Sequence, residues 1–235
     1  MNLTVVSSLA EDRIYYKDQQ KAVVRRGGPA LWISKALKDI GVSFNLVVGE
    51  RSAVVEINVG REGEQGKIIS VPFSPILKNN EADIFLISTI ADEFPFSRVA
   101  GLRGSIALGI QGYVRSAKLK RYSKLRIPLP IRRNVLFLKA TEEDIFFLED
   151  SFVKNQKQKT FLITKGKQGV AMYCFGRRYN INTKIVHSKN AICAGDTFFA
   201  AFVASFLKTQ DAFTACRFAV SYTRIFLSKK PGNFV

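Results

Sequence analysis

Histidine and cysteine are scarce in this chain of 235 residues. His187 is the single histidine, and the three cysteines, Cys174, Cys193 and Cys216, are far apart and form no C-x-x-C pair. A disulfide framework needs paired cysteines, and a zinc site needs several cysteine or histidine ligands at short spacing. The sequence therefore predicts neither, and it excludes any mechanism that needs two histidines of the chain.

Long apolar runs are missing as well. The stretch FFAAFVASFL at residues 198–207 is too short to cross a bilayer and is followed directly by Lys208. The first residues, MNLTVVSSLAEDR, have no positive leader before their apolar positions and contain two acids by position 12, which favours a first strand over a signal peptide. We therefore expect no membrane association and a cytoplasmic protein.

Acidic residues are few: 19 Asp and Glu stand against 36 Lys and Arg, a formal net charge of +17. This excess attracts anions, whether nucleic acid, a membrane surface or a phosphorylated small molecule, but a solvated lysine-rich surface gives the same excess. The densest cluster, residues 115–126 followed by Arg132 and Arg133, contains no acid. A run of this kind is usually a solvated loop or hairpin face, so the sequence predicts no nucleic-acid partner, and a nucleic-acid-binding protein remains an alternative.

Apolar runs that alternate with helical or loop segments are abundant. The runs rich in β-branched residues lie at 3–9, 44–49, 82–89, 105–110, 134–140 and 160–166. This rhythm predicts an α/β protein with a mostly parallel sheet and helices on its faces. Between residues 51 and 73, two short β-like runs surround a polar, glycine-rich loop, which indicates a hairpin inserted in the series.

Three helices have clear boundaries. Residues 29–41 follow a glycine pair, begin with a proline suited to the first turn, carry an apolar stripe and end at Gly41. A second helix begins at Asp196 or Thr197 and has phenylalanines along one face, which is typical of a core helix, and a third covers residues 211–227.

The stretch N-A-I-C-A-G-D-T-F at residues 190–198 places an aspartate at a turn of small residues before a helix. Unpaired amides and the helix dipole make such an N-terminus a site for a phosphate. A carboxylate beside that anion can accept the proton of an incoming alcohol, and phosphoryl transfer needs mainly positioning, charge stabilisation and such a base. Asp196 is therefore a candidate base, while a simple helix cap is the alternative.

Several motifs resemble those of the ribokinase-like (PfkB) carbohydrate kinase family, in order and spacing, over nearly the full chain. The family's D-T-x-G-A-G-D-x-F motif is matched at Ala194, Gly195, Asp196 and Phe198. The other similar features are the pair Gly27-Gly28, Asp12 after the first strand, L-I-T-K-G-K-Q-G at 162–169, and I-Q-G-Y-V-R at 110–115, which is close to a stretch of archaeal-type members.

The resemblance implies a ribokinase-like three-layer α/β/α fold with a mostly parallel central sheet and a small β lid. It implies one domain over residues 1–235, with residues 13–26 and 51–73 contributing a reduced lid that excludes water. The implied activity is phosphorylation of a hydroxyl of a small sugar, polyol or nucleoside with ATP and Mg²⁺. A homodimer through the lid is a further implication.

The resemblance also assigns roles to particular residues. Asp196 would be the general base, and the amides of Cys193, Ala194 and Gly195 would form the anion hole. The remaining assignments are Thr164, Gly166 and Gly169 at the nucleotide, Asp12, Gly27 and Gly28 at the substrate, and Glu143 as the N-x-x-E glutamate that organises Mg²⁺ through water.

The chain departs from the family pattern at several positions. Cys193 replaces a glycine of the anion hole, where a tight turn with positive φ would be strained. The other departures are Ala140 for the asparagine of N-x-x-E, Asn190-Ala191 for D-T, Gly109 for an aspartate before Q-G-Y-x-R, and Trp32 for a substrate-binding asparagine. They leave open a catalytically weak or inactive ligand-binding protein. His187 and Trp32 are interpreted as structural.

Overall fold

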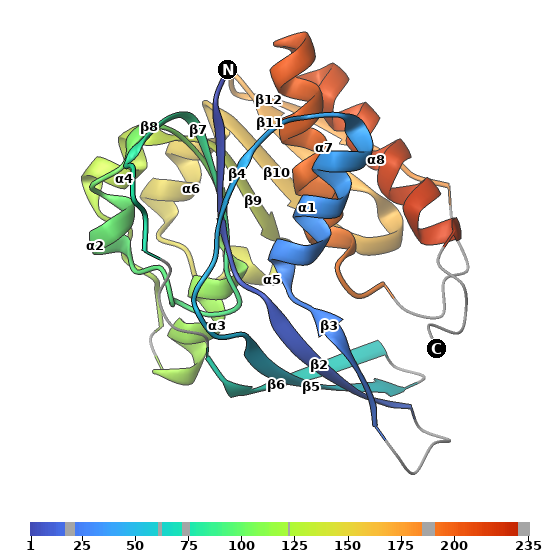
Figure 1. The fold of residues 1–235 in the computed structure, drawn as a ribbon. Helices are drawn as coiled ribbons and strands as arrows, with labels where there is room; N and C mark the ends of the chain where they lie inside the picture. The colour runs from blue at the N-terminus through green and yellow to red at the C-terminus, as the bar shows by residue number, and fades with distance from the viewer. Residues whose placement is uncertain (17–21, 61–62, 72–75, 122, 185–190, 230–235) are drawn as a thin grey trace.

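The structure, a computed structural model, describes residues 1–16, 22–60, 63–71, 76–121, 123–184 and 191–229. Its centre is an eight-stranded sheet in the order β12-β11-β10-β9-β8-β7-β1-β4 (Figure 1). The strands are β1 (Leu3–Ser7), β4 (Asn45–Val47), β7 (Glu81–Ser88), β8 (Arg103–Gly109), β9 (Val135–Thr141), β10 (Thr160–Thr164), β11 (Val170–Cys174) and β12 (Arg177–Ile181). The strands from β4 to β10 pair in parallel, and β11 and β12 extend the sheet by antiparallel pairing.

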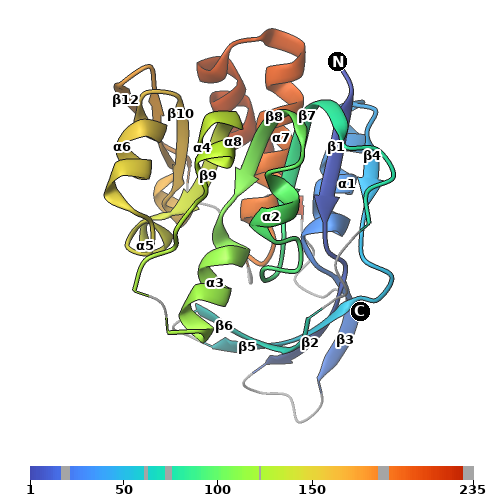
Figure 2. The same ribbon diagram turned by 90° about the vertical axis from the view of Figure 1, so that its left-hand side faces the viewer.

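Helices cover both faces of this sheet (Figures 1 and 2). One face carries α1 (Pro29–Ile40), α7 (Ala194–Thr209) and α8 (Ala212–Lys229), and the other carries α2 (Phe96–Val99), α3 (Gln111–Leu119), α4 (Leu129–Asn134) and α6 (Asp150–Lys157). The one-turn helix α5 (Glu142–Ile145) follows β9 directly. Neighbouring residues of a strand pack in cores on opposite faces of the sheet. Val5 packs in the core beneath α1, α7 and α8, and Val6 packs in the core beneath α2, α3, α4 and α6. The strands are therefore apolar on both faces, and the predicted three-layer α/β/α fold is confirmed.

The helix boundaries follow from local backbone geometry. Helix α1 has Pro29 in its first turn and ends at Gly41, which takes the left-handed conformation at φ 75°. Helix α7 begins at Ala194, two or three residues before the predicted start at Asp196 or Thr197, with Cys193 in the N-cap position. Among the described residues, no helix is both long and apolar enough to span a membrane.

A second sheet lies beyond the carboxyl ends of the parallel strands (Figure 1). It contains β3 (Val23–Gly27), β2 (Ala10–Tyr16), β5 (Ala53–Gly60) and β6 (Gly63–Ser70), in the order β3-β2-β5-β6. The predicted hairpin at 51–73 is the antiparallel pair β5 and β6. Residues 17–21, 61–62 and 72–73 of the expected lid lie outside the described residues. The function of this sheet as a lid, the single domain and the pairing of two subunits through the sheet stay predictions.

Two short links join the second sheet to the rest of the chain. Ser8 and Leu9 separate β1 from β2, and Gly28 alone separates β3 from α1. Gly28 has φ 85°, and a Cβ there would lie 2.6 Å from the Ser8 carbonyl oxygen. A glycine is therefore required at position 28, where the two links pack against each other.

Candidate active site

A cavity of about 1180 Å³ lies between the second sheet and the carboxyl ends of the main-sheet strands. Side chains from β2, β5 and β6 line one part of its wall, and the ends of β9 and β10, the first turn of α7 and part of α8 line the rest. The predicted site residues on this wall are Asp12, Gly28, Glu143, Thr164, Gly166, Gly169, Cys193, Ala194, Gly195 and Asp196. Residues far apart in the sequence are thus brought to one cavity, as expected where parallel strands end.

Asp196 lies in the first turn of α7, where the helix dipole is positive. Its carboxylate is partly buried, and Oδ1 accepts a hydrogen bond of 2.9 Å from the Ser88 hydroxyl. Ser88 is the last residue of β7 and lies 108 positions away in the chain. One carboxylate oxygen is therefore held by a neighbouring strand at the cavity wall.

The turn before α7 differs from the predicted anion hole. Cys193 takes the left-handed conformation, with φ 70° and ψ 4°. The Ala194 N–H donates to the Ala191 carbonyl at 3.0 Å, so this amide is used within the turn. The amides of Gly195 and Asp196 belong to the first helical turn and have no acceptor within the helix. Asn190, where the family motif begins with aspartate, and His187 lie outside the described residues.

A buried lysine that the sequence analysis did not single out adjoins this turn. Lys139, near the end of β9, is only 4% exposed. A Cβ added to Gly195 would lie 2.9 Å from the Lys139 Nζ, so the ammonium group packs against the Gly195 backbone. Lys139 also lines the cavity. A positive side chain and the start of a helix therefore meet at one place, which is suited to an anion.

The glycine loop after β10 has a structural role. Gly169 has φ 95°, and a Cβ there would lie 2.2 Å from the Ile181 carbonyl oxygen, so the fold requires glycine at this position. Gly166 has φ 55° with open space around it. The Thr164 hydroxyl donates to the Ala140 carbonyl at 3.3 Å, and Lys165 pairs with Glu142 at 2.6 Å. The contact of this loop with a nucleotide stays a prediction.

The carboxylates after β9 have different environments. Thr141 and Asp144 form a capping box, in which each side chain accepts a hydrogen bond from the other's backbone N–H. The Asp144 side chain is consequently committed to the backbone of α5. The Glu143 side chain is 75% exposed, lines the cavity and pairs with Lys118 at 2.6 Å.

The carboxylates that the structure describes suit a metal ion held through water. Among the described residues, no group of three or more His, Cys, Asp or Glu side chains is close enough to hold a metal ion. Mg²⁺ usually keeps several waters and binds through one or two carboxylates together with substrate phosphates. An exposed carboxylate on the cavity wall, such as that of Glu143, fits this mode.

Asp12 lies in the part of the cavity formed by the second sheet. It is 4% exposed, and its Oδ2 has no hydrogen-bond partner among the described residues, although the Arg25 Nε lies 3.9 Å away. Burial raises the pKa of Asp12, and the charge of Arg25 offsets only part of this rise. A Cβ on Gly27 would lie 1.9 Å from Oδ2, so Gly27 provides the space for the carboxylate. A buried acceptor of this kind is suited to a hydroxyl donor from a ligand.

Trp32 is structural, as the sequence predicts. It is 6% exposed and packs edge-on against Phe226 of α8, with ring centroids 5.5 Å apart. The position at which the family pattern has a polar substrate contact is therefore apolar in this chain.

Part of the basic cluster is neutralised by acids from other parts of the chain. The ion pairs are Lys118 with Glu143, Lys120 with Asp92, Lys124 with Asp150, and Arg132 with Glu149. The acid-free run of the sequence therefore has acids close to it in space, which favours a solvated surface rather than a nucleic-acid site. Residues 115–119 of this run belong to helix α3, however, and not to the expected loop or hairpin.

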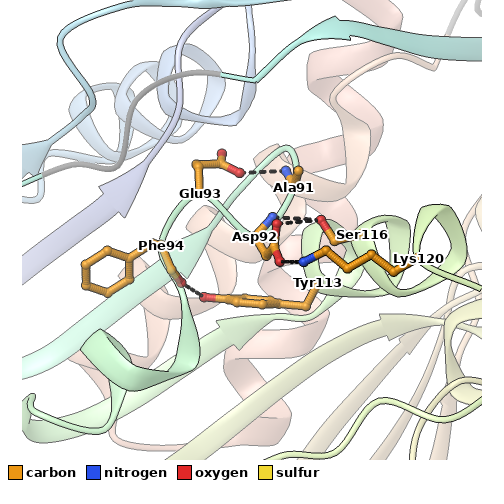
Figure 3. A network of polar contacts seen from close by, with 7 residues as sticks. All are labelled: Ala91, Asp92, Glu93, Phe94, Tyr113, Ser116 and Lys120. Carbon is orange, nitrogen blue, oxygen red and sulfur yellow. Dashed lines mark hydrogen bonds and ion pairs between the residues drawn. The ribbon is translucent and has the colours of Figure 1, made fainter. Parts of the chain in front are cut away.

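A polar network fixes the loop that follows β7 against α3 (Figure 3). Asp92 accepts hydrogen bonds from the Ser116 hydroxyl at 2.9 Å and from Lys120, while the Tyr113 hydroxyl donates to the Phe94 carbonyl at 2.7 Å. Burial acts to raise the pKa of Asp92, but the hydrogen bonds from Lys120 and Ser116 and the charge of Lys120 lower this pKa below its usual value. Glu93 is buried and accepts from the N–H groups of Ile90 and Ala91 at 2.8 and 2.7 Å. The backbone next to Ser88 is thus held firmly.

Comparison with known proteins agrees with this architecture. The chain has the fold of ribokinase. It aligns with the ribokinase of Thermotoga maritima at 17% identity and a TM-score of 0.71, over 98% of this chain and 94% of that one. A nucleoside kinase of Methanocaldococcus jannaschii, described as an archaeal member of the ribokinase family, aligns at 16% identity and a TM-score of 0.74, over 100% of this chain and 94% of that one.

A third similar structure is an uncharacterised sugar kinase of Pyrococcus horikoshii in complex with ATP, at 16% identity and a TM-score of 0.73, over 98% of this chain and 93% of that one. The sequence model of the pfkB family carbohydrate kinases matches residues 139–233. The family model thus matches the C-terminal part of the chain, and the solved structures show a ribokinase-like fold over nearly its full length, as the motifs predict. No curated protein matches its sequence.

Replacing Cys193 by glycine is expected to stabilise the protein. A residue with a Cβ in the left-handed conformation is strained by about 1–2 kcal/mol, and glycine removes this strain at some cost in chain entropy. We expect the free energy of unfolding to rise by about 0.5–1 kcal/mol, which for a chain of this size raises Tm by about 1–4 °C. Circular dichroism during heating measures the change. Cys193→Ala is the matched control because it removes the thiol and keeps the Cβ. Equal Tm values for the two variants would contradict the assignment of strain.

Proposed function

We propose that the protein is a kinase that transfers a phosphoryl group from ATP to a hydroxyl of a small sugar, polyol or nucleoside. The observation that supports this most is the position of Asp196, in the first turn of α7, on the wall of a cavity that also holds Lys139 and the glycine loop. The match of the pfkB family model to residues 139–233 and the ATP complex of a similar sugar kinase are consistent with the proposal.

Asp196 is the proposed general base. Ser88 donates to its Oδ1, which leaves Oδ2 to accept the proton of the attacking hydroxyl. The carboxylate belongs to the same helical turn as the amides that would receive the phosphate. Base and phosphate site are consequently held by one rigid element, which favours an in-line geometry.

Stabilisation of the negative charge on the transferred phosphoryl group is the second requirement of the reaction. The first-turn amides of Gly195 and Asp196 and the ammonium group of Lys139 are the proposed stabilising groups. Lys139 is buried, and the lower effective dielectric there makes its charge more effective than that of an exposed lysine. Mg²⁺, held through water by Glu143, would neutralise part of the phosphate charge when bound.

The proposed acceptor site is the part of the cavity formed by the second sheet. Asp12, through its unpartnered Oδ2, would accept a hydrogen bond from a hydroxyl of the substrate. Gly27 and Gly28 bring the backbone close to this carboxylate. In this proposal the second sheet, including the hairpin of β5 and β6, covers the acceptor and excludes water, so that transfer goes to the alcohol.

A matrix of donors and acceptors tests the proposal. ATP, other nucleotides and pyrophosphate are each combined with sugars, myo-inositol and nucleosides, and acceptor-dependent release of the donor product is measured, with mass spectrometry of the phosphorylated acceptor. We expect turnover with ATP for one acceptor class, well above the rate without acceptor. A folded protein that binds ATP but phosphorylates no acceptor would contradict the proposal.

A binding protein without turnover is the second candidate. Three observations favour it: the left-handed Cys193, the use of the Ala194 amide within the turn, and the apolar Ala140 in place of the asparagine of N-x-x-E. Titration calorimetry distinguishes the two candidates. Tight binding of an acceptor and a nucleotide without any product would support the second one.

A further inference from the structure

We infer that Ser88 is a positioning residue for the base, which rests on the proposed role of Asp196. The Ser88 hydroxyl is the donor that orients the Asp196 carboxylate, at 2.9 Å from Oδ1. The terminal torsion of an aspartate is broad, so without a fixed partner the carboxylate samples many orientations. With Oδ1 held by Ser88, Oδ2 points in one direction for the proton of the acceptor.

Ser88 is itself held in place from one side by β1. Ser7 and Ser88 are partners in the parallel pairing of β1 with β7. The Ser7 hydroxyl, fully buried, donates to the Ser88 carbonyl at 2.6 Å. The loop after Ser88 is fastened by Glu93 and by the contacts of Asp92 with α3 (Figure 3). The hydroxyl is therefore presented from a rigid support.

Gly109 leaves space for the Ser88 hydroxyl on the side of β7 that faces β8. It is the partner of Ser88 in the pairing of β7 with β8. A Cβ at position 109 would lie 3.1 Å from the Ser88 Oγ and 3.3 Å from the Ile87 carbonyl oxygen, closer than ordinary contacts. The family pattern has an aspartate at this position, whereas glycine in this chain leaves room for the Ser88 hydroxyl.

The first experiment compares steady-state kinetics of Ser88→Ala and Ser88→Thr with the wild type, using the acceptor found in the matrix above. Loss of orientation is expected to lower kcat of Ser88→Ala by roughly 10–100-fold. KM for both substrates should stay within about twofold, because neither substrate contacts Ser88 in the proposed mechanism. Ser88→Thr keeps the hydroxyl and should restore most of kcat.

Ser205→Ala is the matched control. It removes another buried serine hydroxyl, from the same helix as Asp196 but about 13 Å further along its axis, and should leave kcat unchanged. A Ser88→Ala enzyme with wild-type kcat, or a Ser88→Thr enzyme as slow as Ser88→Ala, would overturn the inference.

A double-mutant cycle makes the test specific to the hydroxyl. Gly109→Ala should lower kcat by roughly tenfold, because its methyl group displaces the Ser88 Oγ. In the Ser88→Ala background the same substitution should change kcat by less than about twofold. Additive effects of the two substitutions would show that Gly109 and Ser88 act independently and would overturn the inference.

Failure of this inference can be told apart from failure of the proposed function. If the matrix yields no acceptor, or if Asp196→Asn retains full kcat, the proposed function is wrong. If Asp196→Asn is inactive while Ser88→Ala is fully active, the base is correct and the role of Ser88 is not.

Discussion

Replacing Asp196 by asparagine is expected to lower kcat by about 10²–10⁴-fold, the contribution of a general base. Asparagine has nearly the same shape, and its amide oxygen can still accept the hydrogen bond from Ser88. The substitution therefore removes the proton acceptor while the geometry is kept. Steady-state kinetics with the identified acceptor measures kcat, and calorimetry should give an unchanged affinity for the nucleotide.

Asp211→Asn is the matched control for this substitution. Asp211 precedes α8, is exposed and accepts a hydrogen bond from the Thr214 N–H at 2.6 Å. Asparagine caps a helix about as well as aspartate, so this variant should keep both its stability and its kcat. A kcat of Asp196→Asn within a few-fold of the wild type would rule out the base.

Replacing Lys139 by methionine is expected to lower kcat by about 10²–10³-fold, as the loss of one group that stabilises developing charge does elsewhere. Methionine has a similar length and an apolar side chain, so it fits the buried site without an unpaired charge. Affinity for a nucleoside triphosphate should fall more than affinity for the diphosphate, because Lys139 lies beside Gly195, where the terminal phosphate would be held.

Lys159→Met controls for the loss of a lysine that is largely removed from solvent. The Lys159 ammonium group donates to the carbonyls of Arg132, Arg133 and Val135, close to the start of β9 and away from the cavity. Its replacement should lower Tm and leave kcat unchanged below the unfolding transition. If Lys139→Met has wild-type kcat and triphosphate affinity, Lys139 does not contact the phosphate.

The architecture of the main sheet could be predicted from the sequence because its strands are buried on both faces. Val5 and Val6 serve different cores, which makes β1 a continuous apolar run that can be recognised without knowledge of its partners. The second sheet is less evident. Strand β2 contains Glu11, Asp12 and Arg13, and its pairing with β5, more than thirty residues later, depends on tertiary structure.

The site could be predicted in part. Asp196 belongs to a local motif, and the prediction needs only neighbouring residues. The proposed roles of Ser88 and Lys139 could not be predicted, because these residues meet the first turn of α7 only where parallel strands end beside it. The one available signal for Lys139 was a positive charge inside the apolar run of β9. At Ala194 the motif is matched, but the N–H that the motif assigns to the anion hole donates to the Ala191 carbonyl instead.

The connections between the two sheets are unequal in length. Two links are short: Ser8 and Leu9 connect β1 to β2, and Gly28 connects β3 to α1. The Ser8 carbonyl accepts a hydrogen bond from the Ala30 N–H, and the Leu9 carbonyl accepts one from the Ala53 N–H. The returning connections, residues 48–52 and 71–80, are longer. We therefore expect any swing of the second sheet to pivot near the short links, with the β6 edge moving through the largest arc. In such a swing we expect Asp12, near the start of β2, to move less than the β6 edge while the cavity changes width.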